Sequence, residues 1–369
     1  MENFTNERVL LQDLIDYAHK NINNYLVIIV GNVVGITPHE NDFHADTSIT
    51  DEYYTLSQFN RISSCLQKIG FDTLCYFDEM DFIHDVLTHR IRNNYPQKFI
   101  VLNFAQKGLV RGRKSLVPAF CEMNNILHTN SNAFACSFAR EKYYWGLCLR
   151  GLQKTPEGWL YDNIADDWVA GEPPKDIKVI SKLCNQSSSI GLESQDSVFI
   201  YGNDTKEKII SLSHKYDQPV LVQECISGKE VEVPVFFDGK TAFCLPPSGI
   251  NIKNDCVLED KILTNDLRCH GGFTLFDFDE KFPNESQEIK KRTIEIVKLL
   301  DMQGVCRVDY RIDASGDAYV IDINCNPHLT ETSSVYKGFK YLGMEDYSNT
   351  LLAILGLTVK RAQISWVKI

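Results

Sequence analysis

Two aspartates on a predicted β-hairpin, Asp309 and Asp322, have the residue type and spacing of a metal site. The segments 306–312 and 318–324 both alternate polar with apolar residues, which is typical of half-buried strands. Between them lies Gly316, and glycine suits the positive φ that a short turn requires. The sequence therefore predicts two antiparallel strands that each carry one of the aspartates.

The register of this hairpin decides which side chains meet. A four-residue loop, 314–317, places Asp309 opposite Asp322. It also places Arg307 opposite Asn324, on the same face, because side chains two residues apart on a strand point the same way. Like charges that close repel, and two carboxylates with an amide oxygen are ligands that Mg²⁺ accepts. We therefore expect a divalent cation site.

The alternative is a solvated sheet face on which the two acids pair with Arg307 and Arg311. The hairpin alone does not decide between these interpretations, so the rest of the chain has to.

Composition limits the classes of function. The 369 residues carry a net charge of −11 without a run of basic residues, which argues against a nucleic-acid or anionic-membrane surface. The first residues lack the pattern of a secretory signal, and the most apolar run, 26–34, is too short to span a bilayer. Twelve cysteines without a C-x-x-C pair indicate buried thiols in a reducing cytoplasm. The length predicts two or three domains.

Hydrophobic periodicity predicts alternating strands and helices in the first third of the chain, an order typical of a parallel α/β sheet. We expect strands at 26–34, 71–77 and 98–105, and helices at 56–69 and 81–92. Further along we expect helices at 133–150 and 205–216, strands at 178–184 and 219–225, a hairpin at 231–244, a helix behind a capping box at 284–287 and a last helix at 347–355.

Two segments of the middle part suit a nucleotide. Lys182 ends a predicted strand and precedes a loop of small residues, 185–192, and such a pair is able to hold phosphates. The strand 220–225 runs into a polar hinge that would offer backbone groups to a purine, with Glu230 placed to accept ribose hydroxyls. Taken separately, the first is more typical of a surface turn and the second of an edge strand.

The order of these features resembles the ATP-grasp superfamily, and within it the D-alanine–D-alanine ligase group, from about Asn103 to Leu355. The resemblance implies an α/β fold, α+β in its C-terminal half, in which an N-terminal Rossmann-like parallel domain precedes the ATP-grasp fold. It implies three parts: 1–130, a central ATP-grasp subdomain at 131–225, and a C-terminal subdomain with the metal site at 226–369.

The resemblance also assigns roles to residues. It implies Mg²⁺, or alternatively Mn²⁺, on Asp309, Asp322 and Asn324, and it places Arg307 on the phosphoryl group that is transferred. It implies catalytic roles for Lys281 and Ser189 beside Arg307. The residues implied to bind ATP are Lys142, Lys182, Ser188, Ser189, Gln223, Glu224, Ile226, Glu230 and Lys281, with Ser187 in place of the family's glycine.

The departures from the family concern the substrate pocket. His328 replaces a glycine whose amide helps to hold the reaction intermediate, and phenylalanines replace the tyrosines of a closing loop. The glutamate that binds the first substrate's ammonium has only Glu52 as a candidate here, beside an insertion at 35–51. Arg111, Arg113 and Lys114 fall where the family has an acidic loop, either as a solvated loop or as an anchor for a substrate anion. Ser333 matches the serine that binds the acceptor carboxylate.

These observations together predict an ADP-forming carboxylate–amine ligase that acts through an acylphosphate on small-molecule substrates. We expect it in the cytoplasm, without a nucleic-acid or membrane partner, and a homodimer is a possible assembly. The alternatives are a true D-alanine–D-alanine ligase, an ATP-grasp kinase that stops at phosphoryl transfer, and a non-catalytic nucleotide-binding module.

Overall fold

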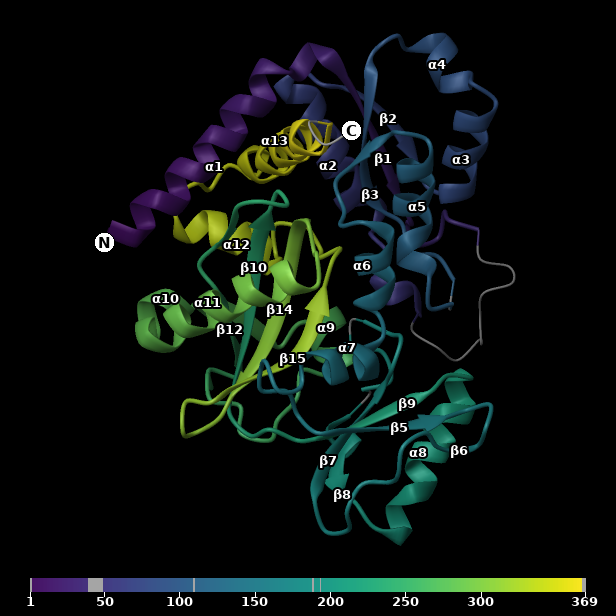
Figure 1. Ribbon diagram of the computed structural model, residues 1–369, viewed down its shortest axis with the longest axis vertical. Helices are drawn as coiled ribbons and strands as arrows, with labels where there is room; N and C mark the ends of the chain where they lie inside the picture. Colours follow the sequence, from purple (N-terminus) through teal and green to yellow (C-terminus); the bar gives the residue numbers. More distant parts are fainter. Residues whose placement is uncertain (1, 39–48, 109, 188, 193, 367–369) are drawn as a thin grey trace.

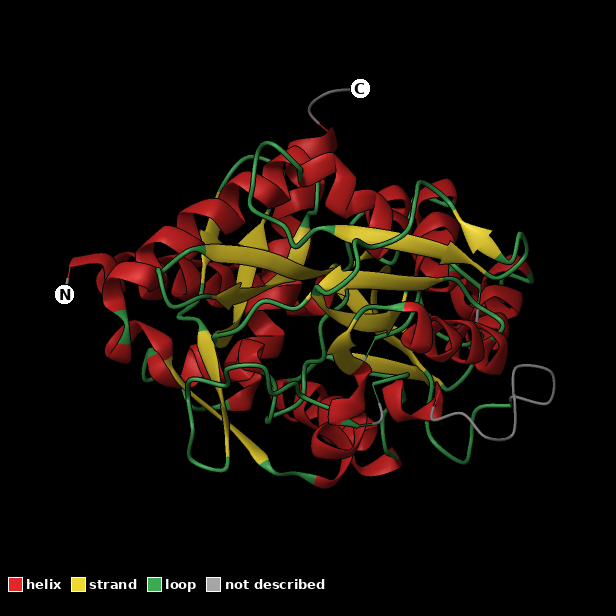
Figure 2. Cartoon of the chain, turned by 90° about the horizontal axis from the view of Figure 1, so that it is seen from below, coloured by secondary structure: helices red, strands yellow, loops and turns green. Residues whose placement is uncertain are grey.

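Three β-sheets follow one another along the long axis of the molecule (Figure 1). The structure is a computed structural model and describes residues 2–38, 49–108, 110–187, 189–192 and 194–366. Within these residues the sheets have four, six and five strands. Helices flank the strands, which lie towards the interior in the view from below (Figure 2).

The first sheet is parallel, in the order β2–β1–β3–β4, as the periodicity predicts. Its strands are β1 (Tyr25–Gly31), β2 (Asp72–Tyr76), β3 (Lys98–Phe104) and β4 (Leu127–His128). The surrounding helices are α1 (Glu2–Lys20), η1 (Ile22–Asn24), η2 (Ile49–Glu52), α2 (Leu56–Ile69), α3 (Glu79–Leu87), α4 (Arg90–Asn94), η3 (Arg113–Ser115) and α5 (Leu116–Met123).

Strand β1 is apolar throughout because both of its faces are covered. Val27 and Ile29 share a core with α1, α2 and the last helix, α13 (Tyr347–Trp366), whereas Leu26, Ile28 and Val30 share a second core with α3, α4 and α5. The last helix therefore packs on the first sheet, far from its neighbours in sequence, and joins the C-terminal end of the chain to the N-terminal part.

The other two sheets are antiparallel and carry most of the predicted site. The five-stranded sheet, in the order β6–β5–β9–β7–β8, is made of β5 (Gly158–Asp162), β6 (Asp167–Trp168), β7 (Lys178–Leu183), β8 (Val198–Ile200) and β9 (Val220–Glu224). The helical elements before and within it are α6 (Ala133–Phe138), α7 (Lys142–Leu149), η4 (Gln195–Ser197) and α8 (Asn203–Tyr216).

The six-stranded sheet has the order β13–β12–β10–β14–β15, with β11 also paired to β10. Its strands are β10 (Lys229–Phe237), β11 (Ala242–Cys244), β12 (Ser248–Ile252), β13 (Phe273–Asp277), β14 (Gly304–Ile312) and β15 (Ala318–Asn324). Its helices are α9 (Asn265–His270), α10 (Phe278–Lys281), α11 (Pro283–Leu299) and α12 (Ser334–Tyr341).

The predicted hairpin register is confirmed at the site and wrong at the turn. Asp309 pairs with Asp322 as expected, but Ile312 pairs with Ala318 instead of Tyr319. A shift of register after Asp309 leaves one extra residue in β15, which is a β-bulge. Because the bulge absorbs the one-residue difference, the turn is one residue longer than predicted while both aspartates keep their face.

Two predicted helices are interrupted. The helix expected at 81–92 ends at Leu87, because His89 adopts a left-handed conformation with φ of 58° before α4 begins. The helix expected at 133–150 divides into α6 and α7, and the break brings Arg140 to a position from which it donates to the Asn185 carbonyl. The capping box expected at 284–287 is also wrong, since α11 begins at Pro283, a residue suited to the first helical turn.

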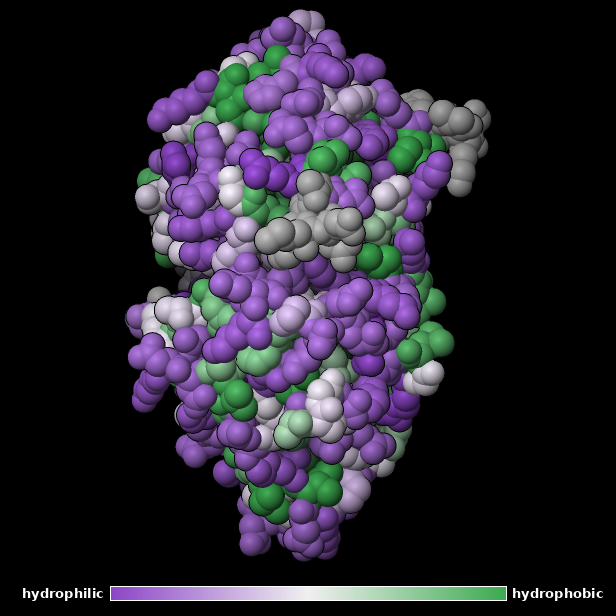
Figure 3. Space-filling model, turned by 90° about the vertical axis from the view of Figure 1, so that its left-hand side faces the viewer, coloured by the Kyte–Doolittle hydropathy of each residue, from purple (hydrophilic) through white to green (hydrophobic). Residues whose placement is uncertain are grey.

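The proposed boundaries at 130/131 and 225/226 fall between the sheets, and the three-part division stays a prediction. In the parts of the chain described above, no helix is both long and apolar enough to cross a bilayer. The face shown in Figure 3 is mainly hydrophilic, with hydrophobic residues in small separate groups.

The packing of α13 on α1 generates a stability prediction. A Cβ added at Gly356 would overlap the backbone carbonyl of Leu14, so Gly356→Ala has to push the two helices apart. We expect the free energy of unfolding to fall by about 1–3 kcal/mol, the usual cost of overpacking, in chemical denaturation. Gly146→Ala is the matched control, because its added Cβ would meet no atom within 4 Å in α7. It should leave stability unchanged or raise it by up to about 1 kcal/mol. Equal effects of the two substitutions would contradict the packing account.

Candidate active site

A cleft of about 520 Å³ is lined by residues of all three sheets and their loops. It brings together most of the residues that the sequence singles out, which are Glu52, Lys142, Lys182, Ser189, Gln223, Glu224, Ile226, Glu230, Arg307, Asp309, Asp322, Asn324, His328 and Ser333. Of the other candidates, Arg113 and Lys281 are described but do not line the cleft, and Ser188 lies outside the described residues.

The paired aspartates lie on the wall of the cleft formed by β14 and β15. Arg307 binds both carboxylate oxygens of Asp309, with Nε–Oδ1 and Nη2–Oδ2 distances of 2.7 Å each. Burial raises the pKa of Asp309 to about 7; Arg307 opposes this shift, and the neighbouring carboxylates Glu232 and Asp322 reinforce it. The pairing with Arg307 fits the solvated-face alternative in part, but Asp309 is buried in a cleft and not solvated.

A third carboxylate, Glu232, belongs to this wall and is missed by the sequence analysis. It pairs with Asp309 across β10 and β14, is buried, and lies 3.2 Å from Arg307 Nη1. Arg268 of α9 approaches its other oxygen at 3.7 Å. The signal for Glu232 was present, because it lies two residues after Glu230 and therefore on the same face of the strand. Arg268 had no such local signal.

The lysines and the serine loop form the opposite wall. Lys142 Nζ donates to the Gln186 carbonyl at 2.7 Å and lies 3.6 Å from Asp322 Oδ1. Burial lowers the pKa of Lys182, and Asp322 opposes that shift. Ser189 has a φ of 57°, and its Oγ donates to the Leu263 carbonyl at 2.6 Å. Among the predicted phosphate-binding residues, Lys142 thus lies beside Asp322, and the loop is held by Lys142 at Gln186 and by the Leu263 carbonyl at Ser189.

The strand β9 and the hinge after it supply the predicted nucleotide contacts. Gln223 is buried and ends β9 beside Glu224, and Ile226 follows in the lining of the cleft. Glu230 is bound by Arg311, whose Nε and Nη2 lie 3.1 and 2.9 Å from the same oxygen, Oε2. Arg311 is therefore a support for Glu230 and not a partner of the aspartates.

Lys281 lies outside the cleft. Its Nζ is 3.0 Å from Cys256 Sγ and lies over the rings of Phe276 and Phe282 at 5.2 and 5.7 Å. Phe278 packs against both of these rings, so the phenylalanines that replace the family's tyrosines form a cluster of their own. The role of Lys281 in binding ATP stays a prediction that requires this segment to move.

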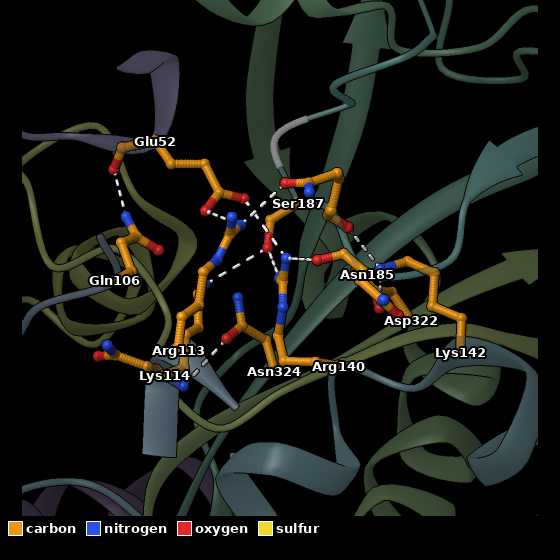
Figure 4. A network of polar contacts seen from close by, with 12 residues as sticks. Glu52, Gln106, Arg113, Lys114, Arg140, Lys142, Asn185, Ser187, Asp322 and Asn324 are labelled. Atoms are coloured by element: carbon orange, nitrogen blue, oxygen red, sulfur yellow. Dashed lines mark hydrogen bonds and ion pairs between the residues drawn. The ribbon is translucent and has the colours of Figure 1, made fainter. Parts of the chain in front are cut away.

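Glu52 and Arg113 form a buried ion pair of 2.9 Å, in which each side chain is at most 3% exposed (Figure 4). Arg113 also donates to Gln186 Oε1 at 2.9 Å, and Arg140 lies 3.8 Å from the second oxygen of Glu52. Burial by itself would raise the pKa of Glu52, but Lys114, Arg113 and Arg140 hold it well below its ordinary 4.5. Glu52 is therefore ionised and already paired.

The basic segment at 111–114 is not the solvated loop of the alternative interpretation. Lys114 is buried, and its Nζ lies 3.3 Å from Ser187 Oγ in the wall of the cleft. Burial lowers the pKa of Lys114 to about 7, and Arg140 and Arg113 add to that shift. Arg111 alone is exposed, 3.4 Å from Glu141. Two of the three cations thus belong to the site. Of the insertion expected at 35–51, residues 39–48 lie outside the described residues.

His328 and Ser333 complete the lining. His328 stacks on Tyr54 with ring centroids 4.2 Å apart and an interplanar angle of 6°. Burial lowers the pKa of His328 to about 4, so its ring is neutral near pH 7. Ser333 caps α12: its Oγ accepts from Tyr336 N at 3.3 Å and donates to the Thr330 carbonyl at 2.7 Å.

Comparisons with known proteins agree with this geometry. Residues 175–355 match the family model described as D-ala D-ala ligase C-terminus. The D-alanine–D-alanine ligase of Ectopseudomonas mendocina is 26% identical over 83% of this chain and 90% of its own length. That of Marinomonas sp. is 27% identical over 70% of this chain and 75% of its own. The ATP-complexed D-alanine–D-alanine ligase of Bacillus anthracis superimposes with a TM-score of 0.64 at 17% identity, covering 92% of this chain and 99% of its own.

The parallel sheet followed by two antiparallel sheets is the fold of the D-alanine–D-alanine ligase structures. Together with the match to the family model it places the chain among the ATP-grasp enzymes, which bind ATP. Within that class it is a D-alanine–D-alanine ligase-like enzyme, since residues 175–355 match the C-terminal model of that family. It is accordingly an ATP-dependent, ADP-forming carbon–nitrogen ligase, and its own substrates are a separate question.

The buried Glu52–Arg113 pair generates a prediction. Glu52→Gln leaves buried cations without a counter-charge, so we expect the free energy of unfolding at pH 7 to fall by about 3 kcal/mol or more. Glu331→Gln is the control, since the Arg61–Glu331 pair is nearly half exposed and its loss should cost less than about 1 kcal/mol. Chemical denaturation measures both. A Glu52→Gln effect as small as the control would contradict the assignment.

The same pair predicts a pH dependence. Because the folded protein holds the pKa of Glu52 below 4.5, its contribution to stability is complete above about pH 4.5 and declines as the pH falls. The stability difference between the wild type and Glu52→Gln should therefore shrink on acidification, which denaturation at a series of pH values would measure. A difference that stays constant down to about pH 3 would be inconsistent with a depressed pKa.

Proposed function

We propose that this enzyme joins a small carboxylic acid to an amine, or to the amino group of an amino acid, through an acylphosphate. The observation that supports it is the convergence in one cleft of Asp309 and Asp322 with Arg307, Lys142 and Lys182. Phosphoryl transfer depends mainly on positioning and on fixed charges that compensate the charge of the transferring group. A protein that only binds a nucleotide has no evident need of this whole set.

The donor atoms suit Mg²⁺. Asp309, Asp322 and Asn324 would present hard oxygen ligands from two adjacent strands, and carboxylate oxygens keep lone pairs beyond those that Arg307 uses. This proposed ligand set consists of two carboxylates and one amide. Among the described residues, no group of three or more His, Cys, Asp or Glu side chains is placed so that it could hold a metal ion. When bound, Mg²⁺ would neutralise part of the charge of the ATP phosphates.

The protein's side chains then divide the work. Lys142 and Lys182 hold phosphate oxygens, Ser189 orders the loop beside them, and Arg307 stabilises the phosphoryl group in transfer. The purine and ribose are held by the hinge residues and the strand that follows, namely Gln223, Glu224, Ile226 and Glu230. Lys281 reaches the phosphates when the segment 273–282 closes, which also keeps water from the acylphosphate.

The bonds change in two steps. First, a carboxylate oxygen of the acid bonds to the γ-phosphorus of ATP, the bond from that phosphorus to the β–γ bridging oxygen breaks, and ADP leaves. Second, the amine nitrogen bonds to the acyl carbon, phosphate leaves with the electron pair of the carbon–oxygen bond, and the nitrogen's proton passes to the medium. If the amine substrate is an amino acid, Ser333 of the cleft lining would bind its carboxylate.

One assay tests the proposed function. Purified enzyme is given ATP, Mg²⁺ and panels of acids and amines, and ADP and products are followed by mass spectrometry. We expect ADP with an amide that appears only when acid and amine are both present. A phosphorylated acid that accumulates and is never aminated would indicate a kinase, and absence of ADP with every pair would indicate a binding module.

Asp322 tests the metal assignment. Asp322→Asn removes a ligand charge from a partly exposed side chain without opening a cavity, so the fold should persist while ADP formation falls by about 100-fold or more. Asp317→Asn is the control: it lies in the same hairpin but pairs with Lys154 outside the cleft, and it should keep near wild-type rates. Thermal unfolding of both variants checks the fold. Normal activity of Asp322→Asn at ordinary Mg²⁺ would refute the assignment.

A further inference from the structure

Four buried charged residues from three separate parts of the chain lie together at one end of the cleft, two of them in its lining and two behind it (Figure 4). They are Glu52, Arg113, Lys114 and Arg140. Arg113 and Arg140 against Glu52 leave one positive charge in excess, and Lys114, whose pKa burial lowers to about 7, adds a second when it is protonated. Including the nearest outer pair, Lys142 with Asp322, does not change that excess. Buried charge of one sign is costly unless it is paired, so this end of the cleft is built to receive an anion.

Glu52 is not free to bind a substrate ammonium. Its Oε2 accepts from Arg113 at 2.9 Å; its Oε1 accepts no hydrogen bond, but it is buried and lies 3.8 Å from the charged Arg140. An ammonium placed beside this carboxylate would also lie close to the positively charged Arg113 and Lys114, and like charges at such distances repel strongly. Glu52 therefore serves to hold the cations in place, whereas its neighbour Asp51, which also lines the cleft, is exposed.

Of the three cations, Lys114 is the one that lines the cleft. Arg113 is held behind it by Glu52, the Gly108 carbonyl and Gln186. Arg140 is likewise held by the Asn185 carbonyl and by Ser187. Lys114 Nζ lies 3.3 Å from Ser187 Oγ, and Ser187 also lines the cleft. An ammonium and a hydroxyl side by side are a suitable pair of donors for a carboxylate or phosphate.

We infer that Lys114, with Ser187, binds a second anionic group of the acid substrate, distinct from the carboxylate that is activated. The substrate class is then a carboxylic acid with a further carboxylate or phosphate and without an ammonium beside its reacting carboxylate. This inference rests on the proposed function and adds the substrate class of the same cleft. It also means that D-alanine is a poor substrate.

The test uses wild-type enzyme with ATP and Mg²⁺, and hydroxylamine as a general amine, so that any acylphosphate is trapped as a hydroxamate. The acids compared are succinate and glutarate, the matched monoacids propionate and butyrate, D- and L-alanine, and 3-phosphonopropionate. We expect kcat/KM for the better dianionic acid to exceed that of its matched monoacid and of both alanines by at least about tenfold, the value of one charge-assisted contact. The phosphonate shows whether the second group is best a phosphate or a carboxylate.

The outcomes separate the inference from the proposed function. Hydroxamate from D- or L-alanine or the monoacids at rates equal to those of the dianionic acids would leave the ligase function intact and overturn the inference. No ADP and no hydroxamate with any acid would overturn the proposed function, and the inference would fall with it. Succinate or glutarate well above the monoacids would support both.

The variant Lys114→Gln tests whether Lys114 causes the preference for dianionic acids. We expect its KM for the dianionic acid to rise by at least about tenfold, and by clearly more than its KM for ATP or for the monoacids. Arg111→Gln is the matched control, because it removes an exposed cation three residues away and outside the cleft. If Lys114→Gln weakens every acid and ATP alike, Lys114 serves the nucleotide and the inference is wrong. Should that variant fail to fold, Lys114→Arg keeps the charge and must keep the preference for the dianionic acid.

Discussion

Three carboxylates on neighbouring strands impose the main electrostatic constraint on this molecule. Glu232, Asp309 and Asp322 occupy facing positions across β10, β14 and β15. Like charges this close are destabilising unless cations lie among them. Some of those cations come from elements remote in sequence, with Lys142 from α7 and Arg268 from α9. The acids of one sheet therefore hold the surrounding elements around a single cleft.

The cleft is electrically uneven along its length. At the wall of β14 and β15 acids and cations are closely matched, so the added charges of a metal and of phosphates can enter together. At the end beside Glu52, cations exceed acids, and the buried pair with Arg113 supports that excess from behind. Such a distribution favours a ligand with phosphates at one end and a further anion at the other. The charge pattern of the cleft thus indicates which kind of substrate it accepts, whereas the fold indicates only the class of reaction.

The hairpin shows how far local patterns go. Alternation and a glycine turn were enough to pair Asp309 with Asp322, because each strand has one face in the core and a slip of one residue would reverse it. The bulge after Asp309 was not foreseeable, since β15 is an edge strand that is also held from outside: Val320 N donates to the Lys154 carbonyl at 2.9 Å. That contact joins segments far apart in sequence and leaves no local mark.

The sequence by itself determined the parallel first sheet, the strand that carries Lys182 with the loop after it, and the shared face of Asp309 and Asp322, because these follow from periodicity and turn chemistry over a few residues. Only the tertiary structure decided that Glu52 meets Arg113 and that Glu232 joins the aspartates. It also turned Lys281 away from the cleft. Burial and charge pairing depend on elements that are far apart in sequence, and no local pattern predicts that these elements meet. Once they meet, residues that looked like candidate ligands pair with one another instead.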